Sequence, residues 1–172
     1  MKKVRFIATS LFYLSRLLAI PYLATAVYII ISFIFKDAMV HPIDAGERFL
    51  INYPFTQIRF LIGDSYSFGY VFEMIAFIGL YGLFFWLLGN IFKTFRQQKL
   101  FTDQGVKRLR IFYLLNFLVP LFFLIAHIAV GYFVLDTLIF AILHFVLGIF
   151  AYFMSVIFSR GLELQEEQDL IF

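Results

Sequence analysis

The chain has no cysteine and little charge. The missing thiols exclude disulfides, covalently attached c-type haem, thiolate metal sites and cysteine nucleophiles. Charged residues make up 15% of the 172 positions and hydrophobic residues 63%, whereas a soluble domain is about half apolar and about a quarter charged. The excess apolar surface must face something other than water, so the composition predicts a membrane protein.

Turn-forming residues are also scarce. Four prolines and ten glycines are too few for an all-β domain, and 26 phenylalanines and ten tyrosines make the chain too apolar for a disordered one. Motifs of the P-loop, HExxH and GxSxG types are absent, as is any string of membrane carboxylates that a pump would need. We therefore expect a helical protein that is not an enzyme and has no bound cofactor or metal.

Four apolar windows are long enough for membrane spans. A helix needs about 20 residues to cross a hydrocarbon core of roughly 30 Å. The windows are residues 17–35, 71–92, 111–135 and 137–158. They predict an all-α bundle of four transmembrane helices that forms a single membrane domain. Because Asp136 is costly to bury, residues 131–137 are expected to form a tight surface turn.

Basic residues indicate the orientation of these spans, because lysine and arginine are retained on the cytoplasmic side. Eleven of them flank one side: Lys2, Lys3, Arg5, Arg16, Lys93, Arg96, Lys99, Lys107, Arg108, Arg110 and Arg160. Only three lie in residues 36–70. The pattern predicts a multi-pass protein of the bacterial inner (cytoplasmic) membrane with both termini cytoplasmic. Arg16, at the inner boundary, is expected to reach lipid phosphate.

The outer segment, residues 36–70, is too long and too apolar to be an unstructured loop. Pro42 and Pro54 divide it into short pieces. Strands over residues 48–53 and 57–62 are one interpretation, and short helices are the other. At the opposite side, residues 1–16 either extend the first span into the cytoplasm or lie on the headgroup surface.

A helix is expected to begin within the inner loop, residues 93–110. Thr102 has the character of an N-cap, Asp103 lies at the positive end of the helix dipole, and Phe101 and Val106 have the spacing of a hydrophobic staple. Lys107, Arg108 and Arg110 follow, either as topology anchors or as a docking patch for an anionic partner or lipid.

The cytoplasmic tail, residues 159–172, is acidic. It contains one basic residue, Arg160, and four acidic residues, Glu163, Glu166, Glu167 and Asp169. Anionic lipid should repel these acids. The tail therefore either contacts the basic loop or projects as a docking element.

Polar residues inside the predicted spans are the default functional candidates, because burying them in hydrocarbon is costly. His127 and His144 are expected at comparable depths, with Glu73 near the same side. This set could ligate b-type haem or a metal or relay protons, or it could provide hydrogen bonds between helices. Asn90 and Asn116 are expected to pair with each other.

Small residues mark two of the spans. They are Gly79, Gly82, Gly89, Ala141, Gly148, Ala151 and Ser155. Such stripes let helix backbones approach closely within the chain or across a homo-oligomer face.

Two segments of the predicted cytoplasmic side resemble a known family. KLFTDQGVKRLRIF at 99–112 and VIFSRGLELQEEQDLIF at 156–172 are similar to segments of an uncharacterised family of small bacterial four-span membrane proteins. The matching residues are Phe101, Thr102, Arg108, Leu109, Arg110, Phe158, Arg160, Gly161, Leu164, Gln165, Asp169 and Leu170. The chain departs at Lys99 and Leu100, where a Gly-Pro-like turn is common, and at Gly105, where asparagine is frequent. Genes of that family often neighbour a small helix-turn-helix regulator, so the resemblance implies a cytoplasmic protein partner.

Three functions remain open from the sequence. The preferred hypothesis is an interaction or regulatory module in the lipid bilayer, with a cytoplasmic docking surface and no direct nucleic-acid binding. The alternatives are a small transport or permeation module and a haem or metal protein that uses His127 and His144.

Overall fold

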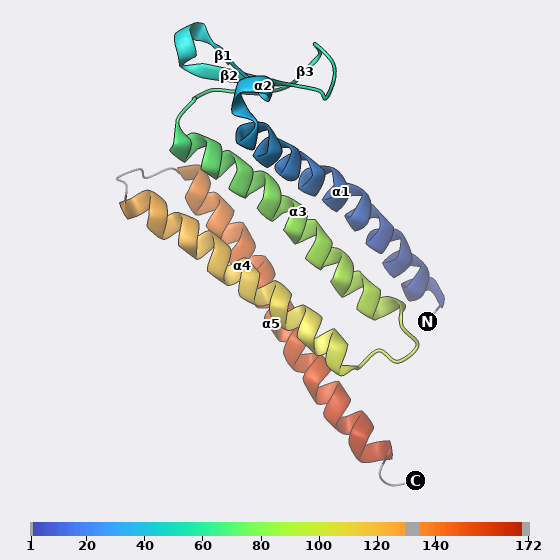
Figure 1. The fold of residues 1–172 in the computed structure, drawn as a ribbon. Helices are drawn as coiled ribbons and strands as arrows, with labels where there is room; N and C mark the ends of the chain where they lie inside the picture. The colour runs from blue at the N-terminus through green and yellow to red at the C-terminus, as the bar shows by residue number, and fades with distance from the viewer. Residues whose placement is uncertain (1, 130–134, 170–172) are drawn as a thin grey trace. The chain divides into compact units, whose positions relative to one another are not determined.

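Four long helices dominate the structure, a computed structural model that describes residues 2–129 and 135–169 (Figure 1). The long helices are α1 (Lys2–Ile34), α3 (Phe68–Arg96), α4 (Asp103–Ala129) and α5 (Leu135–Asp169). Between α1 and α3 lie α2 (Lys36–Met39), β1 (Val40–Ile43), the 3₁₀ turn η1 (Asp44–Gly46), β2 (Arg48–Asn52) and β3 (Arg59–Gly63). The predicted helical class is confirmed, and a small sheet is added to it.

Each long helix is apolar and long enough to cross a membrane. The four contain 33, 29, 27 and 35 residues, against about 20 required for a hydrocarbon core. Large apolar side chains are exposed along all four, among them Leu17, Trp86, Ile125 and Phe150. Exposed apolar surface on this scale is unfavourable in water and favourable in lipid. The chain is therefore built as a multi-pass membrane protein.

The chain forms two compact units. One comprises Met1–Leu14 and Leu87–Phe172, and the other is Ser15–Trp86. We call them the terminal unit and the sheet unit. Helix α1 is continuous from Lys2, so residues 2–16 extend the first predicted span as helix.

The sheet unit contains a three-stranded antiparallel sheet in the order β1-β2-β3. Side chains along β2 alternate between half-buried and buried, as expected for a strand with one face on a core. Its buried Phe49 and Ile51 join Ile29 of α1 and Val71 of α3 in one hydrophobic cluster. Of the two interpretations of the outer segment, strands are confirmed for β2 and β3.

Strand β1 was not predicted, because Pro42 reads as a strand breaker. Its position explains why proline is accepted: β1 is an edge strand, and Pro42 pairs in register with Phe49. A proline nitrogen cannot donate a hydrogen bond, which is tolerated at a sheet edge. A Cβ at Gly63 would overlap the Phe49 ring, so β3 needs glycine at this point.

Helices α1 and α3 approach closely within the sheet unit. A Cβ at Gly82 would lie 2.8 Å from Leu23 Cγ, and one at Gly79 would lie 3.7 Å from Ala26 Cβ. These contacts confirm that small residues on the second predicted span serve packing within the chain. Arg16 is held on α3: its Nη1 donates to the Trp86 carbonyl oxygen at 2.9 Å, and its guanidinium lies 3.6 Å from the centre of the Trp86 ring. Its expected contact with lipid phosphate stays a prediction.

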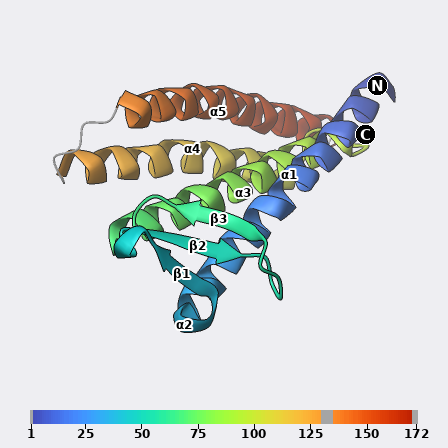
Figure 2. The ribbon, with the colours of Figure 1, turned by 90° about the horizontal axis from the view of Figure 1, so that it is seen from above.

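Helices α4 and α5 lie side by side in the terminal unit (Figure 2). Phe117 of α4 packs on Gly148 of α5, where a Cβ would come within 2.8 Å of the ring. Helix α4 is described as far as Ala129, and the stretch of the predicted third span from 130 to 134 lies outside the described residues. The expected turn at residues 131–137 lies partly outside the described residues, and Asp136 already belongs to the first turn of α5.

Candidate functional site

The segment that joins α3 to α4, residues 97–102, packs closely against the ends of both helices and against α5. We call this region the junction. Thr102 is the N-cap of α4, because its Oγ1 accepts a hydrogen bond from the Gly105 N–H at 3.1 Å and its carbonyl accepts one from the Val106 N–H. Asp103 occupies the first turn, where a negative charge complements the helix dipole. The predicted cap is confirmed. The staple between Phe101 and Val106 stays a prediction.

Aromatic rings and glycines hold α5 against this junction. Phe158 is 2% exposed and makes edge-to-face contacts with Phe95 and Phe101, at centroid distances of 5.5 and 5.3 Å. The Phe101 ring covers Gly161, where a Cβ would lie 2.6 Å from its Cδ1. A Cβ at Gly105 would lie 2.7 Å from Thr94 Cγ2. The start of α4 and the stretch of α5 around Phe158 and Gly161 therefore meet in one place.

Arg108 connects the junction to the end of α3. Its Nη1 donates to Thr94 Oγ1 at 3.3 Å and its Nη2 to Gln104 Oε1 at 3.2 Å. Thr94 is fully buried and in turn donates to the Asn90 carbonyl. Of the three bases predicted as a docking patch, Arg108 is thus partly engaged inside the junction, while Lys107 and Arg110 are exposed.

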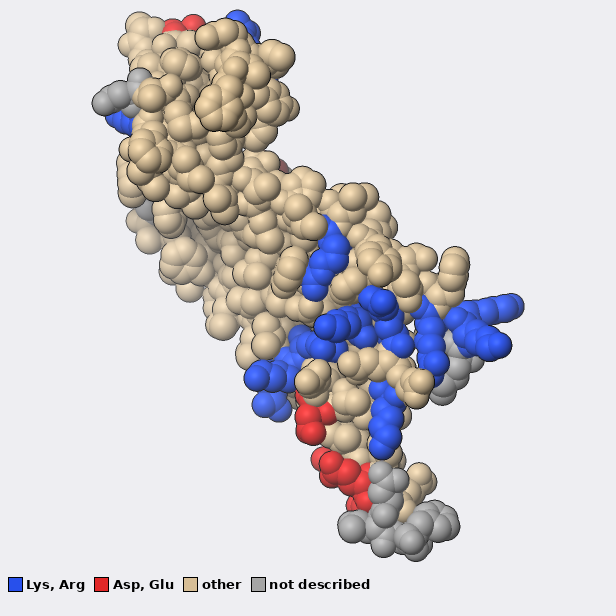
Figure 3. All heavy atoms as spheres, turned by 45° about the vertical axis from the view of Figure 1, so that its right-hand side comes forward, with Lys and Arg blue, Asp and Glu red and all other residues tan. Residues whose placement is uncertain are grey.

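Basic side chains surround the junction (Figure 3). The exposed ones of the terminal unit are Lys2, Lys3, Lys93, Lys99, Lys107, Arg110 and Arg160. Arg96 is half-buried, with its guanidinium 4.6 Å from the Phe12 ring centre and 5.4 Å from that of Tyr13, and this ties the start of α1 to the end of α3. The sequence analysis treated Arg96 only as a topology marker. Its aromatic partners could not be identified without the fold.

Helix α5 continues beyond the junction as an acidic projection, which we define as residues 162–169 (Figure 1). Glu163, Glu166 and Glu167 are exposed, and so is Leu164 at 61%. At the base of the projection Arg160 Nη1 pairs with Glu163 Oε2 at 2.8 Å. Asp169 ends the helix, and its side chain lies outside the described ones.

Polar side chains between α4 and α5 pair differently from the prediction. His144 Nδ1 donates to Asn116 Oδ1 at 2.8 Å, and Asn116 Nδ2 donates to the Phe112 carbonyl. The side-chain partner of Asn116 is thus His144 and not Asn90. His127 Nδ1 and Thr137 Oγ1 share a hydrogen bond of 2.8 Å.

The two histidines lie at different levels of the α4–α5 pair. His127 is at the level of residue 137 and His144 seven residues further along α5, a separation of about 10 Å at 1.5 Å per residue. The prediction of comparable depth is wrong because of the register between α4 and α5: His127 pairs with Thr137, whereas His144 pairs with Asn116, eleven residues before His127 on α4.

A metal centre of three protein ligands is not formed. Among the described residues no group of three His, Cys, Asp or Glu side chains is placed to hold a metal ion. Glu73 is half-buried near the start of α3, in the sheet unit. Within the terminal unit His127 and His144 are about 10 Å apart along α5 and do not converge on one ion. Both histidines instead provide hydrogen bonds between helices, as their alternative interpretation proposed.

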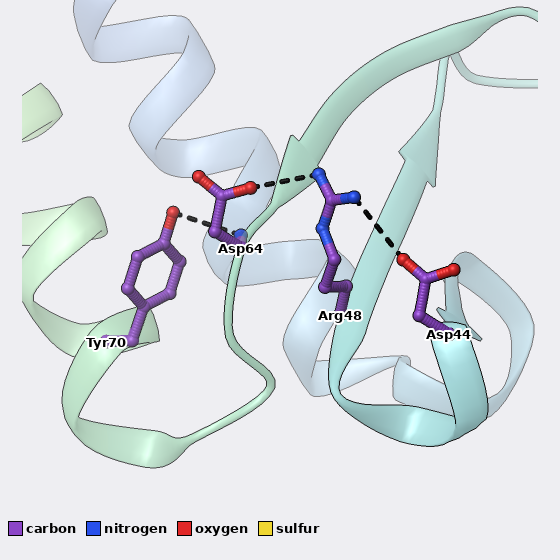
Figure 4. A network of polar contacts seen from close by, with 4 residues as sticks. All are labelled: Asp44, Arg48, Asp64 and Tyr70. Atoms are coloured by element: carbon purple, nitrogen blue, oxygen red, sulfur yellow. Dashed lines mark hydrogen bonds and ion pairs between the residues drawn. The ribbon is translucent and has the colours of Figure 1, made fainter.

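A second polar network was missed by the sequence analysis (Figure 4). Arg48 on β2 pairs with Asp44 Oδ2 at 3.3 Å and with Asp64 Oδ1 at 2.9 Å, and the Asp64 N–H donates to Tyr70 Oη at 3.2 Å. These contacts join the turn between β1 and β2 to the end of β3, and the end of β3 to the first turn of α3. The spacing of Asp44 and Arg48 was a signal for the first pair, whereas the second depends on the β2–β3 register.

Comparison of the chain with protein-family models, with curated proteins and with solved structures gave no match.

Proposed function

We propose that this chain is an interaction or regulatory module of a bacterial inner membrane, and that the junction and the acidic projection dock a soluble cytoplasmic protein. The observation that carries the proposal is the extension of α5 past its contact with Phe101 at Gly161. A span needs no such continuation. A further two turns of helix that expose Glu163, Leu164, Glu166 and Glu167 are available to a partner.

The base of the projection is rigid, which favours recognition. Phe158 and Gly161 are packed against Phe95 and Phe101, and Thr102 and Arg108 hold the start of α4. An element that is already ordered loses less conformational entropy on binding. A partner can therefore bind the projection without first having to order it.

The charges define the partner's chemistry. The projection is acidic with one exposed leucine, and an apolar and acidic helix face suits a groove with basic walls. The resemblance of residues 99–112 and 156–172 to the four-span family suggests a small helix-turn-helix regulator as this protein. Such regulators carry basic surfaces for DNA.

The proposal requires that both termini be cytoplasmic, as the distribution of basic residues indicates. A cysteine at Ser65 should react with an impermeant thiol reagent in intact cells, and a cysteine at Gln97 should react only after permeabilisation. The chain has no native cysteine to interfere. The reverse pattern would place the projection outside the cytoplasm and end the proposal.

The docking role is tested by reversing charge on the projection. In a pull-down of the full chain from native membranes, Glu166→Lys with Glu167→Lys and Asp169→Lys should abolish recovery of a soluble DNA-binding protein. The matched control, Glu166→Asp with Glu167→Asp and Asp169→Glu, keeps all three charges and should retain recovery. Both variants should insert normally, because the changes lie beyond Gly161.

Equal recovery with the reversed and the control variants would contradict the docking role. The transport alternative would then become the leading one, and solute flux into proteoliposomes would be its test. A Soret band in the purified protein would instead revive the haem hypothesis.

A further inference from the structure

The connection between β2 and β3 presents an apolar tip. Phe55 is 108% exposed and Ile58 66% exposed, relative to free side chains, and Tyr53 is also exposed. The turn closes through the Thr56 N–H, which donates to the Tyr53 carbonyl at 3.1 Å. Two large apolar side chains thus extend from the sheet, Phe55 fully exposed and Ile58 about two thirds exposed.

Phe55 is also in an unfavourable backbone conformation. Its φ is +59°, at the third position of the turn that begins at Tyr53 and has Pro54 second. Type II turns place positive φ at this position and favour glycine or asparagine there. A phenylalanine accepts this conformation at a cost, and its ring gains no packing within the chain in return. What stabilises the side chain must therefore lie outside the chain.

The base of the hairpin is attached to α1 at a defined level. Tyr28 Oη donates to the Asn52 carbonyl at 2.6 Å, and the Tyr28 ring packs edge-to-face on Phe60 at 5.2 Å. Tyr28 lies six residues before the end of α1 at Ile34, which is about 9 Å along the axis at 1.5 Å per residue.

Lipid is the surface that α1 meets at this level. Val27, Ile30, Ile31 and Ile34 are exposed on the same stretch of α1, so the hairpin base is attached to α1 where that helix presents apolar side chains. In the same unit the first turns of α3 expose Phe68 and Phe72. Aromatic side chains concentrate where a bilayer meets water.

We propose that the β2–β3 tip inserts Phe55 and Ile58 into the headgroup and upper acyl region of the bilayer that α1 crosses. Arg59, exposed directly after Ile58, can then reach lipid phosphate. The sheet becomes a cap that is held against the membrane at its tip as well as at its helices. This inference rests on α1 being a membrane span and is independent of the docking role and of which side the sheet faces.

A depth-sensitive fluorophore at the tip tests the proposal. Trp86 is the chain's one tryptophan, so Trp86→Phe provides a silent background for single reporters. Phe55→Trp and, separately, Ile58→Trp are introduced into the full chain. Each is reconstituted into phosphatidylcholine vesicles with bromine atoms near the glycerol end of the acyl chains. The control reporter is Glu47→Trp, at an exposed position beyond the opposite end of β2.

The two tip reporters should be quenched by the brominated lipid, protected from aqueous iodide, and shifted to shorter emission wavelength than the Glu47→Trp control. Quenching of both by iodide and not by lipid would show that the tip lies in water and would overturn the proposal. Protection from both quenchers would show that protein covers the tip, a second copy of the chain included, and would overturn it equally. Two reporters keep the test decisive if one substitution prevents folding.

Discussion

Two connections between long helices are built differently. One is the sheet segment, residues 35–67 between α1 and α3, and the other is the junction between α3 and α4. The sheet segment has a hydrophobic core of its own around Phe49, and its Arg48 is neutralised by Asp44 and Asp64. The junction is short and depends on close contacts of glycines with aromatic rings and on one cap. Lysines and glutamates around it are exposed. Charges that satisfy one another stabilise a fold, and charges that face solvent are available to a partner.

The largest effect is expected when a buried side chain is removed from the core of the sheet segment. Phe49→Ala should lower the free energy of unfolding of the sheet unit by about 3–5 kcal/mol, the usual cost of truncating a buried phenylalanine. Amide hydrogen exchange should rise across residues 40–63 and change little across residues 103–112. Phe55→Ala is the matched control, since its ring packs on nothing in the chain, and similar losses from both variants would refute the assigned core.

The junction should be most sensitive at its closest contact. Gly161→Leu forces a side chain into the Phe101 ring and should cost about 1–3 kcal/mol, as overpacking commonly does. Thermal unfolding in detergent, followed by proteolysis near residue 101, measures this. Gly69→Leu is the control, because nothing lies within 4 Å of a Cβ at Gly69. If the two variants behave alike, Phe101 does not constrain Gly161.

A smaller effect is expected at the cap of α4. Thr102→Ala removes the acceptor of the Gly105 N–H and should cost about 1 kcal/mol of local helix stability. Chymotryptic cleavage at Phe101 should accelerate, while membrane insertion is unchanged. Thr102→Ser retains the oxygen and should cleave at the wild-type rate. Unchanged cleavage of the alanine variant would argue against the cap.

The smallest effect is expected for the charge network of the sheet segment. Asp64→Asn weakens a pair whose carboxylate is 76% exposed, and such surface pairs contribute about 0–1 kcal/mol. The shift in thermal midpoint should be slight and should vanish at high salt. Glu47→Gln removes an equal charge and leaves both partners of Arg48 in place. A large shift confined to Asp64→Asn would mean that the network does more than join the sheet to α3.

Much of the helical architecture could be predicted because it depends on local composition. Apolar runs such as residues 17–35 and 71–92 have about the length that a bilayer requires. Helix α1 contains the first of them as far as Ile34, and α3 contains the second whole. The start of α4 could be predicted as well, because a threonine N-cap followed by an acid is a signal contained within a few residues.

The candidate site was predictable in its residue types and not in its pairings. Thr102, Arg108 and the acids of the tail were identified from the chain, but the hydrogen bond of Arg108 to Thr94 and the packing of Phe101 on Gly161 were not. These contacts join residues 14 and 60 positions apart. The residue pattern along one helix carries no information about contacts with residues so far away in the sequence.

The sequence by itself determined that four helices are long and apolar enough to cross a membrane, because that property depends only on residue type and run length. The tertiary structure alone decided that Pro42 lies in an edge strand, that Asn116 pairs with His144, that Arg48 bridges two aspartates, and that Phe55 is left without a partner in the chain. Each of these depends on the register between elements. Register is set by the packing of side chains from distant parts of the chain.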